Sequence, residues 1–532
     1  MQCFSRVQPH LILVAPDERI LPLMFAKSLA LRFTLPLMVI FGLLCAMRPA
    51  AAQFPGGPKI PAPDAYEPHP RLVVITDMGN EPDDQMSFLR LLLYSNQIDL
   101  EAMIATTSTW QKTAIHPETM HQLVKGYAEV RPNLLLHAKG WPEARTLDER
   151  IYPGQAAYGM ADTGAGHSTA GSNALAAAIE KQDPRPLWIS LWGGANTLSQ
   201  ALIDLRSRHS AAELEALVAH LRVYSISDQD DAGPWIRRSF PGLDYIVQPS
   251  SPDSQEYVHA TWTGISGDLY YRNGTCADSS LITNEWLDAN IRAKGSYGKL
   301  YPRFMFIMEG DTPSFLNLID NGLAASMRPD YGGWGGRYIY RQPYGETHPV
   351  WTQGGDEFFR STSQDEVVAR DGHHCAEDQA SIYRWRAGYQ NDFAARMDWT
   401  VKDFAHANHA PLVTLNGQPG SAPIEVTVKA GESFTLDASG TTDPDKQPLH
   451  YSWFVYSEAG RAGAMGADLA LTSADAPKIS VTAQSPCAPA WIPGLFPCTM
   501  EGVAHVILAV TDEGSPALTS YRRVIVHVKP AR

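Results

Sequence analysis

Short apolar runs alternate with helical patterns through the middle of the chain, and this alternation most constrains the fold. The run RLVVIT at 71–76 is continuous and apolar, as expected of a strand that is buried on both faces of a sheet. Similar runs recur at 101–105, 133–137, 187–191, 221–226, 243–247 and 303–308. Helical patterns lie between most of them, at 116–128, 171–181, 195–207, 211–219 and 313–320. The alternation predicts an α/β fold, a doubly wound, mostly parallel sheet with helices on both faces.

The sequence changes character at the linker-like segment 408–411, which reads Asn-His-Ala-Pro. Beyond it, short β-branched segments are separated by turn residues, at 424–428, 432–436, 449–455, 478–482, 503–510 and 522–528. Regular strands without helices predict a small all-β sandwich. The turn at 443–445 and the strand after it resemble cadherin-like and polycystic-kidney-disease-type modules, which are spacers or binding units. We therefore predict an α/β domain at 53–407 and a β-sandwich at 408–532.

The N-terminus has the pattern of a secretory signal. Residues 33–47 are strongly apolar and uncharged, and Lys27 and Arg32 precede them. A basic flank, a short apolar run and small residues at a cleavage site are typical of such signals, and the run is shorter than the about 20 residues of a membrane span. We predict a signal at 1–52, with Met24 as the true start, and a secreted or periplasmic protein without a membrane anchor. A retained anchor is the alternative.

Charge and cysteine content limit the partners. Lysine and arginine number 43 against 57 for aspartate and glutamate, so the formal net charge is −14. An acidic protein has no general attraction for phosphate backbones, and we expect no nucleic-acid partner. Two of the six cysteines lie in the predicted signal, and an even number in an exported chain favours disulfides. Cys487 and Cys498 flank a proline-rich loop and are expected to pair, which leaves Cys276 with Cys375.

Polar and aromatic residues directly follow five of the predicted strands. They occupy 76–84, 106–110, 192–197, 227–231 and 309–313. The carboxyl ends of parallel strands face one edge of an open sheet, and ligands bind there. Helix capping explains any one cluster equally well, since Asp, Asn, Ser and Thr bond free backbone N–H groups. Five clusters at the same sheet end predict a ligand site.

The first of these clusters is the most acidic. Asp77, Glu81, Asp83 and Asp84 place four carboxylates within eight residues. Carboxylates held together repel one another, and the N–H groups of a helix N-terminus offset only about 0.3–1 kcal/mol per charge. Calcium accepts carboxylate, carbonyl and water oxygens in flexible geometry. The turn therefore predicts a divalent-cation site, with a solvated acidic loop as the alternative.

The acidic turn and later motifs resemble a known family. A strand that ends in Asp, followed by Gly and then by Asp-Asp at the start of a helix, resembles the N-terminal motif of nucleoside hydrolases. A more specific resemblance, over nearly the whole mature chain, is to secreted bacterial cellulose-binding proteins with a nucleoside-hydrolase-like domain and a C-terminal β-domain. The motifs that carry it are NEPDD at 80–84, MEGDTPSF at 308–315, YGGWGGR at 331–337 and DFAARM at 392–397.

The resemblance implies roles for individual residues. Asp77 would bind calcium and act as the general base toward the attacking water. Asp84, the backbone carbonyl of Asn196, and Asp311 would complete the protein ligands of the metal. Asp83 would bind sugar hydroxyls. A metal that acidifies water and a carboxylate that accepts its proton suit attack on an oxocarbenium-like carbon.

The sequence departs from the nucleoside-hydrolase pattern in its supply of protons. Gly310 stands where that family has a histidine, so protonation of the leaving group needs another donor. Glu309, Glu81 and Asp228 are the candidates, and the sequence does not decide between them. The departure favours cleavage of an O-glycosidic bond over cleavage of a nucleoside.

Further residues are candidate sugar contacts. Trp110 follows the second predicted strand, where its ring suits a sugar face. The glycine-rich segment 331–337 presents Trp334 and Arg337 to a ligand in one interpretation and is a structural loop in the other. The complete predicted set of substrate contacts is Asn80, Glu81, Asp83, Trp110, Asp228, Glu309, Trp334 and Arg337.

Two functions of different class remain open. The first is a secreted, metal-assisted hydrolase of glycosidic bonds in plant or bacterial glycans. The second is a non-catalytic protein that binds cellulose or another polysaccharide through a degenerate site. Retention of Asp77, Asp83, Asp84 and Asp311 favours the first, because a site without a reaction has no physical need for mutually repelling carboxylates. The sequence leaves the sugar, the linkage and the oligomeric state open.

Overall fold

The structure is a computed structural model, and it describes residues 60–250, 265, 276–305, 307–353, 363–369, 371–462, 464–487 and 500–531. The predicted signal at 1–52 lies outside these residues. None of the helices that the structure describes combines the length and apolar character needed to cross a bilayer.

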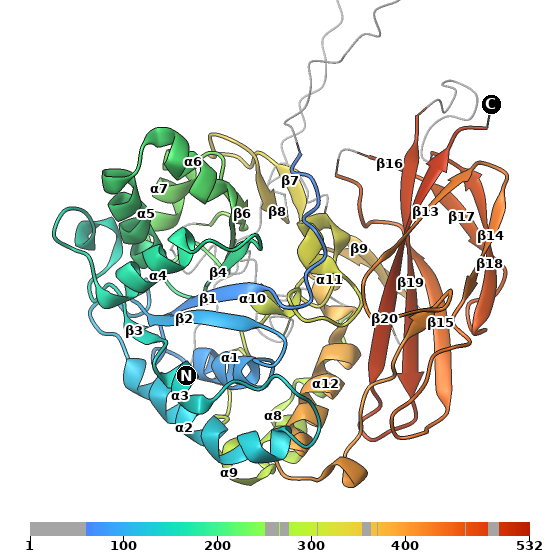
Figure 1. Cartoon of the computed structure of the whole chain (residues 1–532), viewed down its shortest axis with the longest axis horizontal. Helices are drawn as coiled ribbons and strands as arrows, with labels where there is room; N and C mark the ends of the chain where they lie inside the picture. The colour runs from blue at the N-terminus through green and yellow to red at the C-terminus, as the bar shows by residue number, and fades with distance from the viewer. Residues whose placement is uncertain are drawn as a thin grey trace, which may run out of the picture. The chain divides into compact units, whose positions relative to one another are not determined.

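An eight-stranded sheet lies at the centre of the first domain, with the order β3-β2-β1-β4-β5-β6-β8-β7 (Figure 1). Its strands are β1 (Arg71–Thr76), β2 (Asp99–Ala105), β3 (Ile151–Pro153), β4 (Leu187–Leu191), β5 (Leu221–Ser225), β6 (Asp244–Ile246), β7 (Ile339–Arg341) and β8 (Val350–Thr352). Neighbouring strands are parallel, except that β7 runs antiparallel to β8. The strand order reverses at β1, which pairs with both β2 and β4. In such sheets this reversal marks the place where ligands bind.

Helices cover both faces of the sheet. They are α1 (Pro82–Leu92), α2 (Pro117–Leu134), α3 (Ala144–Asp148), α4 (Ala170–Glu180), α5 (Asn196–Arg208), α6 (Ala211–Ala219), α7 (Ala232–Ser239), α8 (Asn284–Leu287), α9 (Gly295–Gly298), α10 (Pro313–Leu316), α11 (Ala380–Tyr383) and α12 (Arg386–Trp399). Leu72 and Val74 of β1 enter a core with α1, α2 and α12, whereas Val73 and Ile75 enter a second core with α4, α5 and α7. Alternate side chains of one strand are thus buried in two different cores, one on each face of the sheet. The predicted doubly wound fold is confirmed.

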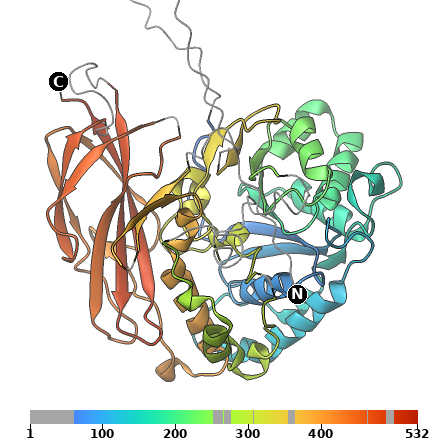
Figure 2. The ribbon, with the colours of Figure 1, turned by 180° about the vertical axis from the view of Figure 1, so that it is seen from behind.

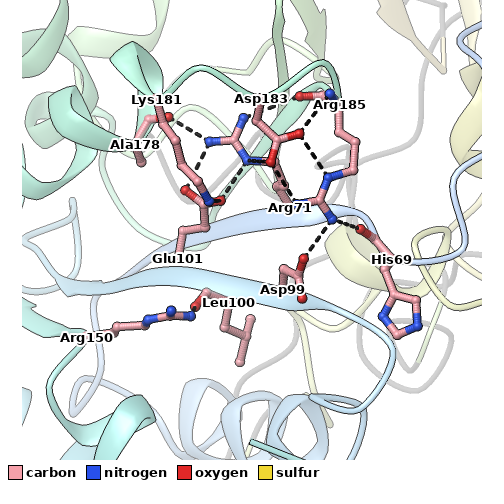
Figure 3. Close-up of polar contacts among 10 residues, drawn as sticks. All are labelled: His69, Arg71, Asp99, Leu100, Glu101, Arg150, Ala178, Lys181, Asp183 and Arg185. Atoms are coloured by element: carbon pink, nitrogen blue, oxygen red, sulfur yellow. Dashed lines mark hydrogen bonds and ion pairs between the residues drawn. The ribbon is translucent and has the colours of Figure 1, made fainter. Parts of the chain in front are cut away.

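Ion pairs fix the amino-terminal end of the sheet (Figure 3). Arg71, the first residue of β1, is buried, and its guanidinium donates to both carboxylate oxygens of Glu101 on β2, at 2.6 and 3.0 Å. The same guanidinium donates to the carbonyl oxygen of Ala178 on α4 at 2.8 Å. Lys181 joins Glu101 at 2.6 Å. This end of the sheet is therefore closed by paired charges, and the acidic residues of interest lie at the other end.

Two predicted strands are wrong. The run at 133–137 begins inside α2, where Leu134 is buried, and continues into turns after the helix. The run at 303–308 contains no strand in its described residues, 303–305 and 307–308. The last strands of the sheet, β7 and β8, come from later in the chain. A short apolar run has no periodicity that separates a strand from a buried helix end or an apolar loop.

The C-terminal domain is an all-β sandwich, as predicted, and Figure 2 shows it from behind. Its strands are β11 (Thr414–Leu415), β12 (Gln418–Pro419), β13 (Ile424–Lys429), β14 (Ser433–Asp437), β15 (Leu449–Tyr456), β16 (Met465–Gly466), β17 (Asp468–Leu471), β18 (Lys478–Ser485), β19 (Gly502–Asp512) and β20 (Thr519–Lys529). One sheet has the order β13-β20-β19-β15, and the other has the order β14-β18-β17. Buried side chains such as Trp453, Val506 and Val524 fill the space between them. The boundary at 407/408 stays a prediction.

A disulfide joins Cys276 to Cys375, which confirms the predicted pair. Cys375 lies on β10 (His374–Glu377), which forms a hairpin with β9 (Asp365–Val368). Cys487 is also disulfide-bonded, but its predicted partner Cys498 lies outside the described residues.

Candidate metal centre at the strand ends

A tight turn connects β1 to α1 and carries the acidic sequence. The Thr76 hydroxyl donates to the Asp84 carboxylate and accepts the N–H of Met78 at 3.1 Å. Gly79 has a φ of +100°, in the region that glycine alone adopts without strain. Pro82 then occupies the first helical position, where its fixed φ suits a helix start. The turn therefore sets Asp83 and Asp84 in the first turn of α1.

Three aspartates converge at this point. Asp83 and Asp84 of α1 meet Asp311, which lies just before α10, and one carboxylate oxygen of each lies within 4.8 Å of the other two. All three side chains are buried, with residue exposures of 8, 4 and 3%. The structure thus brings together Asp84 and Asp311, as the resemblance implied, and adds Asp83. We call these residues the acidic trio.

The acidic trio has the features of a cation site. Among the described residues, no lysine, arginine or histidine forms an ion pair with any of its members. The Oδ2 atom of Asp311 is buried and has no hydrogen-bond partner in the described part of the chain. Leaving a buried polar atom unpaired costs about 1–3 kcal/mol, and more when it is charged. Calcium and magnesium take such hard oxygen ligands, so the trio fits a divalent metal ion.

Burial and mutual repulsion raise the pKa of the three carboxyls of the acidic trio. Burial, followed by the charges of Glu81 and Asp77, raises the pKa of Asp83 to about 8. The pKa values of Asp84 and Asp311 lie well above the usual range, first through burial and then through the neighbouring aspartates. A cation bound at the trio would offset both the burial and the repulsion that raise these pKa values.

Asp77 adjoins the acidic trio without being one of the three carboxylates that meet. Burial raises the pKa of Asp77 to about 6, against the effect of a hydrogen bond with the Ser108 side chain. Gly193, after β4, packs against Asp77, because a Cβ atom at Gly193 would lie 2.9 Å from the Asp77 Cβ. Asp77 also repels the charges of Asp84 and Asp311. Its predicted roles as ligand and general base stay predictions, and its position beside the trio suits a proton acceptor.

Asn196 links the loops around the site. Its side-chain Oδ1 accepts from Thr106 at 2.9 Å, while Nδ2 donates to Thr107 Oγ1 at 3.0 Å and to the Ala157 carbonyl at 2.9 Å. Its backbone N–H donates to Asp230 at 3.1 Å. The amide side chain is therefore committed to these loops, and metal ligation by the backbone carbonyl of Asn196 stays a prediction.

Two of the three predicted proton donors are held in buried ion pairs. Glu309 Oε2 lies 2.8 Å from Arg90 Nε, and both side chains are fully buried. Asp228 accepts two hydrogen bonds from Arg237, each 2.8 Å long. Glu81, the residue before α1, is partly exposed, and burial raises its pKa. Of these three candidates, Glu81 alone offers a carboxyl that is not locked in an ion pair.

Trp110 and Asn80 lie at the edge of the acidic site. Trp110 is 42% exposed, and its backbone N–H donates at 3.0 Å to Ser108, the residue that contacts Asp77. Asn80 is partly exposed and donates its N–H to the Asp77 carbonyl at 3.3 Å. An exposed aromatic ring beside polar groups suits a sugar face, so both residues remain candidate substrate contacts.

Trp334 and Arg337 are committed to packing. Trp334 is 2% exposed and packs edge-on against Tyr389 and Tyr521, with 6.4 Å between ring centroids in each pair. Arg337 is buried and donates to Asp365 at 2.7 Å. Neither side chain offers a face to a ligand, which favours the structural-loop interpretation of 331–337 over a role in sugar binding.

His116 lies against the acidic turn and was missed by the sequence analysis. Its ring contacts Gly79, and it is the residue that immediately precedes α2. Only its place between the second strand and the following helix could have signalled it. A contact between two loops that are distant along the chain leaves no periodic pattern in the sequence.

A doubly wound sheet with buried aspartates on its first strand–helix turn defines a nucleoside-hydrolase-like protein. A family model described as the nucleoside-hydrolase-like domain of cellulose-binding Sde182 matches residues 71–338. The model for the C-terminal domain of cellulose-binding protein Sde0182 matches residues 433–528. The chain therefore belongs to the Sde182 family of nucleoside-hydrolase-like proteins.

A solved structure agrees with this assignment. It is a nucleoside-hydrolase-related hypothetical protein from Saccharophagus degradans, described as associated with carbohydrate metabolism. The two sequences are 32% identical, and the match covers 87% of this chain and 100% of that one with a TM-score of 0.71. The type III effector XopQ in complex with adenosine diphosphate ribose is 13% identical over 63% of this chain and 96% of its own, with a TM-score of 0.30. No curated protein matches the chain.

Proposed function

We propose that this protein is exported and hydrolyses glycosidic bonds at the acidic site with the help of a calcium ion held by Asp83, Asp84 and Asp311. The observation that carries the proposal is the buried trio with an unpartnered Asp311 oxygen, at the sheet end where ligands bind. The family description as cellulose-binding and the carbohydrate association of the neighbour support a glycan as the substrate. The Cys276–Cys375 disulfide supports export.

The residues around the trio divide the chemical work. A bound divalent cation supplies positive charge that makes water more acidic and anchors sugar hydroxyls. Asp77 accepts the proton of the attacking water, and its pKa of about 6 leaves it largely ionised at neutral pH while keeping it basic enough for the task. Ser108 orients the Asp77 carboxylate. Trp110 offers its exposed ring to the sugar.

The test is release of sugar from a panel of plant and bacterial glycans, with Ca²⁺ and with a chelator. We expect release to require the cation and to fall by about 10²-fold or more in Asp77→Asn, because a positioned general base contributes on that scale. Glu215→Gln, an exposed substitution on α6, is the matched control and should not change the rate. Failure of the unsubstituted protein to release sugar from any glycan would overturn the proposal.

A second candidate function is non-catalytic binding of cellulose or another polysaccharide. The observation that favours it is the commitment of Glu309 and Asp228 to buried ion pairs, which removes two of three predicted proton donors. Retention on insoluble cellulose without release of soluble sugar, unchanged by Asp77→Asn, would support this function over hydrolysis.

A further inference from the structure

Hydrolysis of a glycosidic bond needs a donor that protonates the departing oxygen, as well as the base that activates water. No side chain at position 310 fills this role, because residue 310 is glycine, and a Cβ atom there would lie 2.8 Å from Asp83 Oδ2. Glu309 and Asp228 are held in ion pairs with arginine. Of the donors expected from the sequence, Glu81 alone remains, and the loop packed against the acidic turn offers a second candidate.

The segment between β2 and α2 packs along the acidic turn. The Ser108 side chain is hydrogen-bonded to Asp77. Gln111 donates to the carbonyl oxygens of Asp77 and Met78, each at 3.2 Å. These contacts hold the whole segment against the turn, and the residue that ends the segment, before α2, is His116.

The His116 ring is seated on Gly79. A Cβ atom at Gly79 would lie 2.7 Å from His116 Cδ2 and 3.0 Å from Cγ, so any larger residue would collide with the ring. Position 79 thus requires glycine for two reasons. Its φ is +100°, and a larger side chain there would collide with the His116 ring. The turn between Asp77 and Glu81 is shaped to accept this ring.

A carboxylate orients the imidazole. His116 Nδ1 lies 2.7 Å from Glu118 Oε1, and this bond lowers the pKa of Glu118. A carboxylate on Nδ1 fixes that nitrogen as a donor and leaves Nε2 for a ligand. Nε2 is bonded to Cδ2, the ring atom that a Cβ atom at Gly79 would approach most closely, and it has no protein partner among the described residues. The His116 side chain is 37% exposed, so the ring is accessible.

We propose that His116, oriented by Glu118, is the acid that protonates the departing oxygen of the glycosidic bond cleaved at this site, an inference that rests on the proposed function. A bond forms between the water oxygen and the anomeric carbon as the bond from that carbon to the leaving oxygen breaks. The leaving oxygen keeps the bonding electron pair and takes the Nε2 proton of the imidazolium. Asp77 takes the proton that the water loses, and solvent returns one proton from Asp77 to His116. The net change is the addition of one water molecule across the bond.

The elements packed around His116 carry other ionisable groups. They are Glu118 and His121 on α2, Lys112 in the loop before it, and Asp77 and Glu81 on the turn. Glu81 is the rival donor, because its carboxyl is not held in an ion pair.

Two substrates with different leaving groups distinguish a residue that acts as an acid from one that only binds the substrate. An unactivated glycan needs protonation of its leaving oxygen, whereas a dinitrophenyl glycoside releases a stable anion. We expect His116→Gln to lower kcat/KM about 10²-fold or more on the glycan and by no more than about threefold on the activated glycoside. Glu118→Gln should lower the rate in the same selective way, because it leaves the ring unoriented.

A matched control lies on the same helix. His121 bonds Asp148 through Nδ1 at 2.6 Å and is 44% exposed, but it lines a separate surface hollow with Lys125 and Arg145. We expect His121→Gln to leave both rates unchanged. The rise in Tm on addition of Ca²⁺ should be the same in His116→Gln as in the unsubstituted protein, which shows that the acidic trio is intact.

Two results would overturn the role of His116. Equal losses on the two substrates would make it a binding or structural residue, and wild-type rates on both would leave Glu81 as the donor while hydrolysis itself stands. If the unsubstituted protein cleaves neither substrate class, the proposed function fails and this inference fails with it.

Discussion

At the scale of single residues, the acidic site holds buried aspartates close together at a cost in folding stability. The ordinary pKa of an aspartate in an unfolded chain is about 3.9, whereas burial raises those of Asp77 and Asp83 to about 6 and about 8. A group whose folded pKa is raised contributes stability that is complete below the unfolded pKa and is lost as the pH rises through the folded value. The metal-free protein should therefore lose stability progressively between about pH 4 and pH 8.

The first prediction is that a cation reverses this loss. Ca²⁺ should raise Tm more at pH 8 than at pH 6, because fewer protons compete for the carboxylates, and binding at 100 times Kd stabilises by about 2.7 kcal/mol. Asp311→Asn should remove most of the rise, since it takes away the buried, unpartnered oxygen. Thermal unfolding with Ca²⁺ and with chelator, at both pH values, measures this. A rise in Asp311→Asn equal to that in Glu215→Gln would contradict it.

At the scale of elements, strands and helices with a clear local pattern could be predicted from the sequence, whereas contacts between residues distant along the chain could not. The predicted ranges of β1, β4 and α6 coincide with the observed ones, because each has an uninterrupted apolar run or a helical period. The family resemblance placed Asp84 and Asp311 at one site, although they are distant along the chain and the strand predicted before Asp311 is absent from the described residues of 303–308. The run at 133–137 failed because Leu134 ends helix α2 and the two leucines after it lie in turns. The contact of His116 with Gly79 depends on how two loops pack, which no local pattern encodes.

The second prediction concerns the opposite end of the sheet. Arg71→Met should destabilise the protein by about 3 kcal/mol, the low end for a broken buried ion pair, because Lys181 still pairs with Glu101. Urea unfolding measures the loss. The Ca²⁺-induced rise in Tm should stay at the wild-type value, since the two ends of the strands are independent. A loss below about 1 kcal/mol, as for an exposed pair, would contradict the assignment of Arg71 as a structural anchor.

At the scale of the whole molecule, strand β20 ties the sandwich to the α/β domain. The N–H groups of Tyr521 and Arg523 donate to the carbonyls of Asn321 and Gly322, at 2.9 and 3.1 Å. The cores are shared as well, because Tyr456, Ile507 and Tyr521 of the sandwich pack in the same cluster as α1 and α12. We call this contact region between the sandwich and the α/β domain the seam. It is packed like a protein interior rather than like a contact between separate modules.

The glycine-rich segment 331–337 connects this seam to the acidic site. Arg523 donates to the Gly332 carbonyl at 2.7 Å. Asn317, which follows α10, accepts from Gly335 N–H at 2.7 Å and donates to the Gly336 carbonyl at 3.0 Å. Since Asp311 lies just before α10, the sandwich supports the segment that carries a member of the trio.

The third prediction follows from the burial of Arg523. Its side chain is fully buried and donates to the carbonyls of Leu323 and Gly332 and to His505, whose pKa burial holds well below its usual range so that the ring accepts. Arg523→Met would leave these acceptors unpaired at about 1–3 kcal/mol each. We expect the unsubstituted protein to unfold in a single calorimetric transition, and Arg523→Met to unfold at a lower temperature in two.

The exposed Arg238 on α7 supplies the control, and Arg238→Met should leave the transition unchanged. Two transitions in the unsubstituted protein would contradict a shared core. A variant Arg523→Met that melts like Arg238→Met would show that β20 does not couple the domains through this side chain. Because 331–337 rests on both β20 and Asn317, loss of coupling should also weaken Ca²⁺ binding at Asp311, and the Ca²⁺-induced rise in Tm of the variant measures that second effect.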